Sequence, residues 1–81
     1  MALSQTEVLA GLAELVNEDT GIDISQVQMD KSFVDDLDID SISMLTIINN
    51  AEKMFKVTIP EEKVADLKTV GDAVNFITEA Q

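Results

Sequence analysis

The sequence predicts an all-α fold: a small bundle of three main helices plus one short helix, with a long loop between the first and second helices. Three segments carry apolar residues at the three- and four-residue intervals of an amphipathic helix. Two of them follow a serine or threonine with an acidic residue three positions later, the pattern of a capping box. No segment clearly has the alternating pattern of a strand. The 81 residues, 46% of them hydrophobic, suffice for one core, and we expect a single domain over residues 1–81.

The first helix is expected to begin after Ser4. In the run Ser4-Gln5-Thr6-Glu7, the serine hydroxyl and the glutamate carboxylate can each accept the backbone amide of the other residue. Helical spacing then continues through five apolar residues, Val8, Leu9, Leu12, Leu15 and Val16. We expect this helix to end before Gly21.

A long polar loop is expected to follow, and it contains apolar residues that we expect to lie on the core. These are Ile22, Ile24, Val27, Met29, Phe33, Val34 and Leu37. The loop is longer than a typical connection between helices, and loops of this length are often functional.

The second helix is expected from about Ser41 to Phe55. At about 100° per residue, one arc of this helix is apolar. The arc comprises Met44, Ile47, Ile48, Ala51, Met54 and Phe55. The opposite arc is polar and includes Ser43, Thr46, Asn49, Asn50, Lys53 and Lys56.

A short helix and a last helix complete the expected fold. Ile59-Pro60 suits the start of a short helix over residues 61–66, because proline is tolerated in a first turn. Thr69-Val70-Gly71-Asp72 resembles a second capping box. Apolar residues at helical intervals follow, namely Val70, Ala73, Val74 and Ile77.

The chain is strongly negative. Sixteen aspartates and glutamates face five lysines and no arginine, which gives a formal net charge of −11. Such a protein repels nucleic acid and anionic membranes and is steered toward basic surfaces on partner proteins. The alternative is that the acidic residues only keep a small domain soluble. We expect protein partners, no nucleic-acid or membrane partner, and a monomer.

Cysteine and histidine are absent from the sequence. The lack of cysteine excludes disulfides, thiolate chemistry and cysteine-based zinc sites. No basic segment precedes an apolar run at the N-terminus, and no apolar stretch approaches the ~20 residues of a membrane span. With no histidine, cysteine, arginine or glycine-rich phosphate loop, little is left to build a catalytic site. We expect a cytoplasmic protein that is not an enzyme and has no metal site.

The most distinctive run is Asp35-Asp36-Leu37-Asp38-Ile39-Asp40-Ser41-Ile42, in which a serine follows an acidic cluster. No histidine or cysteine is available to activate Ser41, and an unactivated serine hydroxyl is a poor nucleophile. Ser41 therefore suits a site of covalent modification better than a catalytic site. The alternative is that Asp40 and Ser41 are ordinary capping residues, since either side chain can accept the first backbone amides of a helix.

Two apolar residues, Ile42 and Leu45, fall outside the apolar arc and lie within one turn of Ser41. Exposed apolar side chains beside charges suit a transient docking surface. The alternative is that both residues pack under the long loop.

Asp36, Asp38 and Asp40 also have the 1, 3, 5 spacing of an EF-hand calcium loop. The rest of that pattern does not fit, because position 6 is Ser41 instead of glycine and position 12 is Ile47 instead of glutamate. Only weak binding of Mg²⁺ or Ca²⁺ by the acidic cluster is left open.

The run around Ser41 resembles the acyl carrier proteins, whose mark is an Asp-Ser-Leu tripeptide. The tripeptide stands here as Asp40-Ser41-Ile42. The resemblance covers nearly the whole chain, including Ile59-Pro60-Glu61-Glu62 and Leu67-Lys68-Thr69-Val70-Gly71-Asp72. The sequence is most similar to free-standing (type II) fatty-acid carriers of the actinobacterial kind.

The resemblance implies that Ser41 carries 4′-phosphopantetheine, which a phosphopantetheinyl transferase adds from coenzyme A with Mg²⁺. The protein would then shuttle acyl groups, held as thioesters, between acyltransferase, ketosynthase and other synthase enzymes of fatty acid biosynthesis. The implied partner surface comprises Asp36, Asp38, Asp40, Ile42, Leu45, Glu52, Glu61 and Glu62. The acyl tail would lie in space left by the small Ala51 beside Ile47, Met54 and Phe55.

Two features depart from the family pattern. Ile42 replaces the usual leucine, and the second helix has Glu52 as its only acidic residue, beside Lys53 and Lys56. This leaves open a carrier of a type II polyketide or other specialised pathway. A peptidyl or aryl carrier is disfavoured, because Leu37-Asp38-Ile39-Asp40 lacks the usual Gly-Gly. An unmodified helical adaptor for protein interactions is the alternative of a different class.

Overall fold

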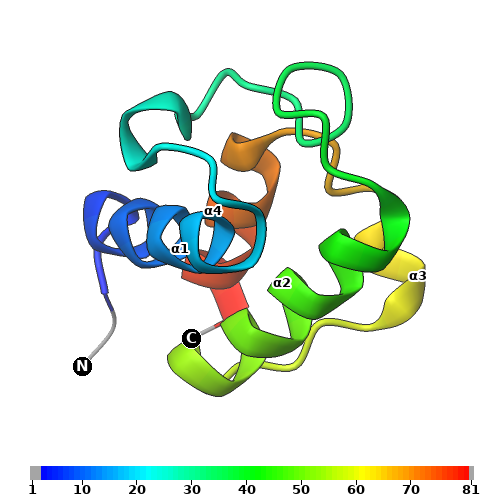
Figure 1. Ribbon diagram of the computed structural model, residues 1–81. Coiled ribbons are helices and arrows are strands. Elements are labelled where there is room, and N and C mark those ends of the chain that lie inside the picture. The colour runs from blue at the N-terminus through cyan, green and yellow to red at the C-terminus, as the bar shows by residue number, and fades with distance from the viewer. Residues whose placement is uncertain (1–2, 81) are drawn as a thin grey trace.

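The computed structural model describes residues 3–80. The helical segments are α1 (Gln5–Thr20), the 3-10 turn η1 (Ile24–Gln26), α2 (Ser41–Phe55), α3 (Glu61–Val64) and α4 (Val70–Ala80). Three main helices and one short helix confirm the predicted all-α bundle (Figure 1). Between residues 3 and 80 the extended structure is limited to an isolated bridge joining Ser32 and Thr69.

The ends of α1 lie where the sequence predicts them. At the N-terminus, the Ser4 hydroxyl accepts the Glu7 N–H and the Glu7 carboxylate accepts the Ser4 N–H, each at 3.3 Å. At the C-terminus, Gly21 has a φ of 80° and donates its N–H to the Asn17 carbonyl at 2.8 Å. Glycine adopts this left-handed conformation without steric cost, so α1 ends there.

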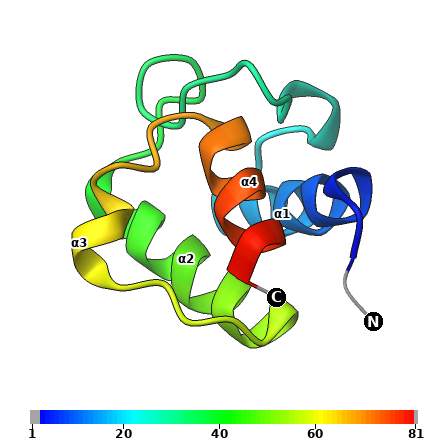
Figure 2. The same cartoon turned by 180° about the vertical axis from the view of Figure 1, so that it is seen from behind.

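α1 packs against both α2 and α4 (Figures 1 and 2). These three helices supply most of the buried side chains. α1 and α2 are in close contact at Gly11, where an added Cβ would lie 2.8 Å from Phe55 Cζ. The completely buried side chains include Val8, Leu12, Val16, Ile47, Val70, Val74 and Ile77.

The buried face of α2 matches the predicted apolar arc except at Met54. The buried residues of this helix are Met44, Ile47, Ile48, Ala51 and Phe55. Met54 is 46% exposed, so the prediction is wrong for this residue. The Met54 sulfur would lie 3.0 Å from a Cβ on Gly11, which means that Met54 covers the edge of the α1–α2 contact instead of entering the core.

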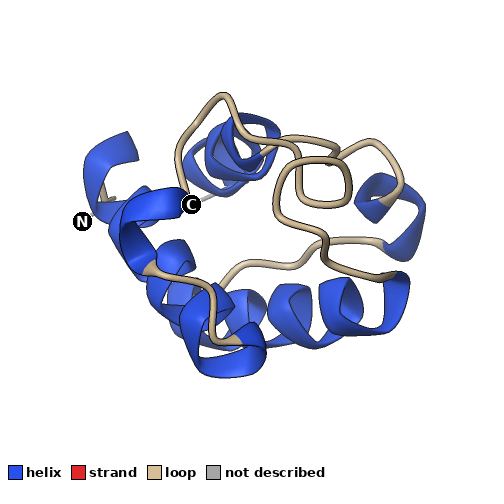
Figure 3. Ribbon diagram, turned by 45° about the horizontal axis from the view of Figure 1, so that its top comes forward, coloured by secondary structure: helices blue, strands red, loops and turns tan. Residues whose placement is uncertain are grey.

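The long loop and the chain just before α4, both drawn in tan in Figure 3, are joined by backbone hydrogen bonds. The Phe33 N–H donates to the Lys68 carbonyl at 3.0 Å, and the Val70 N–H donates to the Lys31 carbonyl at 2.9 Å. These bonds flank the Ser32–Thr69 bridge and fix two segments that are far apart in the sequence.

Most of the apolar residues of the loop lie on the core, as expected. Val27, Phe33 and Leu37 are buried, and Ile22 and Met29 are partly buried. The expectation is wrong for two others, because Ile24 is 47% exposed and Val34 is 58% exposed. Ile24 lies in the turn η1, which has no buried residue, and Val34 lies at the rim of a cavity described below.

The short helix α3 is shorter than the predicted span of residues 61–66. It ends at Val64, and residues 65–66 form a turn. The second capping box is present, since the Thr69 hydroxyl accepts the Asp72 N–H at 3.1 Å and the Asp72 carboxylate accepts the Thr69 N–H at 3.2 Å. None of the described helices is long and apolar enough to cross a membrane.

Candidate functional site

Ser41 is the first residue of α2, and Asp40 is the residue that caps this helix. The Asp40 carboxylate accepts the Ser43 N–H at 2.8 Å, and the Asp40 carbonyl accepts the Met44 N–H at 3.0 Å. The Ser41 side chain is exposed, and its hydroxyl has no hydrogen-bond partner within residues 3–80. The capping function therefore belongs to Asp40, and the Ser41 hydroxyl remains available for chemistry.

The acidic segment before α2 is folded back on itself. The Ser32 carbonyl accepts the N–H groups of Asp36 and Leu37, at 3.1 and 3.0 Å, and the Asp36 carboxylate accepts the Ser32 N–H at 2.7 Å. Asp38 then adopts a left-handed backbone with a φ of 55°, which redirects the chain toward Ser41. The neighbouring side chains of Leu37 and Ile39 are buried, and this fixes where α2 begins.

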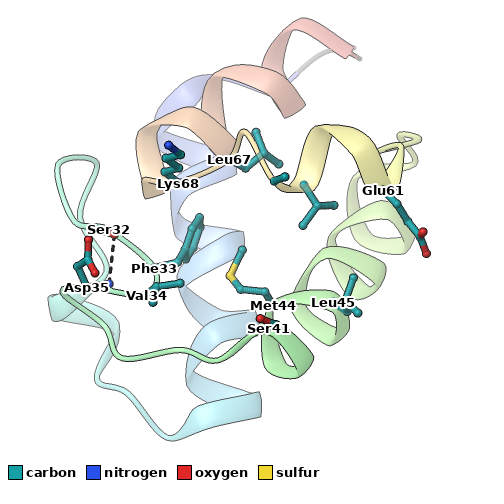
Figure 4. Close-up of a pocket in the computed structure, with 12 residues that line it drawn as sticks. Ser32, Phe33, Val34, Asp35, Ser41, Met44, Leu45, Glu61, Leu67 and Lys68 are labelled. Carbon is teal, nitrogen blue, oxygen red and sulfur yellow. Dashed lines mark hydrogen bonds between the residues drawn. The ribbon is translucent and has the colours of Figure 1, made fainter.

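An open cavity of about 680 Å³ lies beside Ser41 (Figure 4). Its walls come from the loop over residues 32–35, the first turns of α2, and the segment from α3 to Lys68. Phe33, Met44 and Leu67 point into it and make its interior apolar (Figure 4). The exposed hydroxyl of Ser41 thus stands at the edge of a space that apolar atoms can enter.

The position of this cavity overturns the sequence-based expectation. Space was expected beside Ala51, but Ala51 and Ile47 are completely buried and Phe55 fills the contact with Gly11. The cavity lies near the opposite end of α2, where Met44 and Leu45 line it. The walls depend on the pairing of the long loop with the segment before α4, and helical periodicity carries no information about that pairing.

The two apolar residues next to Ser41 do not pack under the loop. Ile42 is 76% exposed and Leu45 is 44% exposed, which removes the alternative that both pack under the loop. Leu45 also lines the cavity. Exposed apolar side chains therefore flank Ser41 on the outer face of α2.

The acidic residues of the predicted partner surface do not all have the same environment. Asp36, Asp38, Asp40, Glu61 and Glu62 are exposed, whereas Glu52 is only partly exposed. Glu61 lines the rim of the cavity, with its carboxylate pointing outward (Figure 4).

The Glu52 carboxylate is directed toward backbone. It accepts the Ile59 N–H at 2.8 Å, in the connection between α2 and α3. Sequence reasoning missed this contact, because the two residues lie seven positions apart and outside a common helix.

The acidic cluster does not form a metal-binding constellation. Within residues 3–80, no group of three or more histidine, cysteine, aspartate or glutamate side chains could hold a metal ion. Asp36 and Asp40, two of the three EF-hand-like positions, accept backbone amides instead.

Comparison with known proteins relates this site to a family. Residues 10–77 match the family model described as "Phosphopantetheine attachment site". The acyl carrier protein of Kocuria rhizophila is 65% identical over 78 residues, which cover 96% of each chain. This chain belongs to the acyl carrier protein family. The acyl carrier protein of Beutenbergia cavernae is 62% identical over 81 residues, covering 100% of this chain and 99% of its own.

The fold agrees with that of a solved acyl carrier protein. The structure of the Enterococcus faecalis protein superposes with a TM-score of 0.81 at 30% identity, covering 98% of this chain and 100% of the other. Acyl carrier proteins bear covalently attached 4′-phosphopantetheine and are carriers, not catalysts. This chain is accordingly an acyl carrier that binds its cofactor covalently and works with a phosphopantetheinyl transferase and synthase enzymes.

Proposed function

We propose that Ser41 is the residue that carries 4′-phosphopantetheine, and that the protein carries acyl groups in fatty acid biosynthesis. One observation supports this above the others. The Ser41 hydroxyl is exposed and unpartnered within the described residues, at the rim of an apolar cavity, while Asp40 alone caps α2.

The residues around Ser41 fit this cofactor. When bound, 4′-phosphopantetheine supplies the thiol that the chain lacks, and that thiol holds the acyl group as a thioester. A phosphodiester on Ser41 would lie at the N-terminus of α2, where the helix dipole and backbone amides favour an anion. The neighbouring aspartates oppose this attraction. Their repulsion favours a phosphopantetheine arm that moves freely over one held against the protein. The apolar walls formed by Phe33, Met44 and Leu67 suit an acyl tail.

The partners that this surface suits are enzymes with basic patches: the phosphopantetheinyl transferase, acyltransferase, ketosynthase and other synthase enzymes. Ile42 and Leu45 offer a small apolar contact next to Ser41. The acidic residues around them provide long-range attraction, and they are Asp36, Asp38, Asp40, Glu61 and Glu62. Electrostatic steering raises association rates without tight binding, as a shuttle requires. A single carrier domain over residues 1–81, acting as a cytoplasmic monomer, fits this function.

The experiment is intact-mass measurement after incubation with coenzyme A, Mg²⁺ and a broad-specificity phosphopantetheinyl transferase. Wild type should gain one phosphopantetheine, and Ser41→Ala should gain none. Ser43→Ala is the matched control, because the capping bond at this position uses the backbone N–H and survives the substitution. A well-folded wild type that gains no mass, or modification of Ser41→Ala, would contradict the proposal.

One feature leaves open a type II polyketide pathway as a second candidate. Glu52 is the only acidic residue of α2, and Lys53 in its last turn is basic. Comparing kcat/KM for the loaded carrier with a fatty-acid ketosynthase and with a type II polyketide ketosynthase separates the two. A clear preference for the polyketide enzyme would overturn the assignment to fatty acid synthesis.

A further inference from the structure

The connection between α2 and α3 is organised around one residue, Glu52. Its carbonyl accepts the N–H of Lys56, the residue that ends α2, and the N–H of Val57 at 3.2 Å. Its carboxylate accepts the N–H of Ile59 at 2.8 Å. Glu52 therefore accepts hydrogen bonds from three backbone amides of the connection. The bond to its carboxylate is the one made by Ile59, the last residue before Pro60 and α3.

The carboxylate bond acts where α3 is attached. Ile59 is buried, and Pro60, the N-cap of α3, restricts the backbone immediately after it. Pro60 has no side-chain capping bond to offer, and none of the residues of α3 is buried. Besides the partly buried Val64, the position of this short helix therefore depends on its two ends, Ile59 on one side and the buried Leu67 on the other.

α3 in turn forms one wall of the cavity. Glu61 and Val64 line the cavity together with Ser41, Met44 and Leu45 of α2, and Figure 4 shows α3 on another side of the cavity from Ser41. A displacement of the connection at Ile59 would move this wall relative to Ser41, because α3 would then be attached through the partly buried Val64 and the buried Leu67, and not at its N-terminal end.

We propose that Glu52 is a positioning residue: its carboxylate fixes the α2–α3 connection, and thereby holds α3 with Glu61 and Val64 on another side of the cavity from Ser41. This assigns Glu52 a function inside the protein in place of a charge that partner enzymes read. The proposal deepens the proposed function of Ser41 and rests on it for its consequence in modification, but its structural part stands independently.

The test compares Glu52→Ala and Glu52→Gln with wild type. Glutamine retains an oxygen that can accept the Ile59 N–H but has no charge, whereas alanine lacks both. Glu14→Ala, which removes an exposed carboxylate from α1, is the matched control. The first readout is NMR without any partner enzyme, which gives the hydrogen-exchange rate of the Ile59 amide and the chemical shift of the Val64 amide. The second is the KM and kcat of the transferase for each variant.

Glu52→Ala should speed exchange of the Ile59 amide by about tenfold, since a hydrogen bond to a charged acceptor is lost. It should also shift the Val64 amide resonance and raise the KM of the transferase. Glu52→Gln should remain closer to wild type in both readouts, and Glu14→Ala should match wild type. Because the conservative variant removes the charge, its rescue separates positioning from charge recognition.

Two results would overturn the proposal. One is an Ile59 amide that exchanges at the wild-type rate in Glu52→Ala. The other is a KM that rises equally in Glu52→Gln and Glu52→Ala, since partner enzymes would then be reading the charge. If the transferase modified no variant, wild type included, the proposed function would fail, while the amide exchange would still decide whether Glu52 positions α3.

Discussion

The backbone N–H of Gly71 donates to the carbonyl oxygen of Met29 at 2.9 Å, and a Cβ on Gly71 would lie 2.8 Å from that same oxygen. The first turn of α4 and the long loop therefore meet with no side chain between them. Next to this bond, the Val70 N–H donates to the Lys31 carbonyl at 2.9 Å. Together these contacts hold the loop segment that continues into Phe33 and the wall of the cavity.

Gly71→Ala is expected to destabilise the protein by about 1–3 kcal/mol, because the methyl group meets backbone that cannot rotate away. Urea denaturation followed by circular dichroism measures this loss. Gly21→Ala is the comparison, since open space surrounds Gly21 and only its positive φ opposes a side chain. We expect a smaller loss there, about 1 kcal/mol. A Gly71→Ala variant as stable as wild type would show that the loop moves aside freely.

Local sequence signals were sufficient for most of the helices. The hydroxyl and carboxylate pairs at Ser4 and Thr69 mark helix starts because they bond amides within one turn. Gly21 marks the end of α1 for an equally local reason. Local chemistry left Ser41 open between a modification site and a helix cap, and the resemblance of the surrounding run to the acyl carrier proteins was needed to choose it.

The geometry around Ser41 depends on contacts between distant segments, and these could not be predicted. The cavity exists because Phe33 bonds to the backbone of Lys68, 35 positions along the chain. The role of Glu52 depends on how the connection to α3 turns back over α2. Met54 was misplaced because the close approach at Gly11 decides which α2 residues enter the core.

Asp38 offers a test of backbone strain next to the site. Its φ of 55° is a conformation that glycine adopts freely and that asparagine tolerates better than most residues. Asp38→Gly is expected to raise the free energy of unfolding by about 0.5–1 kcal/mol, and Asp38→Val to lower it by about 1–2 kcal/mol. Thermal unfolding of both variants measures these changes.

Asp38→Asn separates the backbone contribution from the charge contribution. Asparagine suits the left-handed conformation and removes one carboxylate from the acidic cluster. Glycine removes the same carboxylate, so the extra stability of Asp38→Gly over Asp38→Asn measures the relief of backbone strain alone. A Val variant as stable as wild type would rule out strain at this position.

Asp23 gives the protein a pH dependence away from the site. Its carboxylate accepts the N–H and the hydroxyl of Ser25, each at 3.0 Å, and these bonds hold the pKa of Asp23 below its ordinary value. A carboxyl whose pKa is lower in the folded protein stabilises the fold above the unfolded-state pKa. That stabilisation is lost as the pH falls through the folded-state pKa.

Asp23→Ala should therefore be less stable than wild type at neutral pH, and the difference should shrink as the pH falls from about 5 to 2. Urea denaturation at several pH values measures the difference. Asp23→Asn provides the control, because its amide oxygen still accepts hydrogen bonds but does not titrate in this range. A difference between wild type and Asp23→Ala that stays constant with pH would show that the ionised carboxylate contributes nothing specific.

Glu61 tests whether partner enzymes read charge at the rim of the cavity. Glu61→Lys should raise the KM of the transferase roughly tenfold, because a repulsive charge slows association. Its stability should stay within about 0.5 kcal/mol of wild type, since the side chain is exposed. The KM increase should diminish at high salt, which screens exposed charges. Glu79→Lys, on the last turn of α4, is the control for net charge, and an equal rise in KM there would count against a local surface.

Asp40 combines a charge beside Ser41 with the cap of α2, and two substitutions separate these roles. Asp40→Asn keeps an oxygen that can accept the Ser43 N–H, so its stability should remain near that of wild type. Asp40→Ala removes the cap as well and should lower the free energy of unfolding by about 1 kcal/mol. If partners read the charge, both variants should raise the KM of the transferase by a similar factor, because both lose the carboxylate. A wild-type KM in Asp40→Asn would mean that Asp40 acts through the helix cap alone.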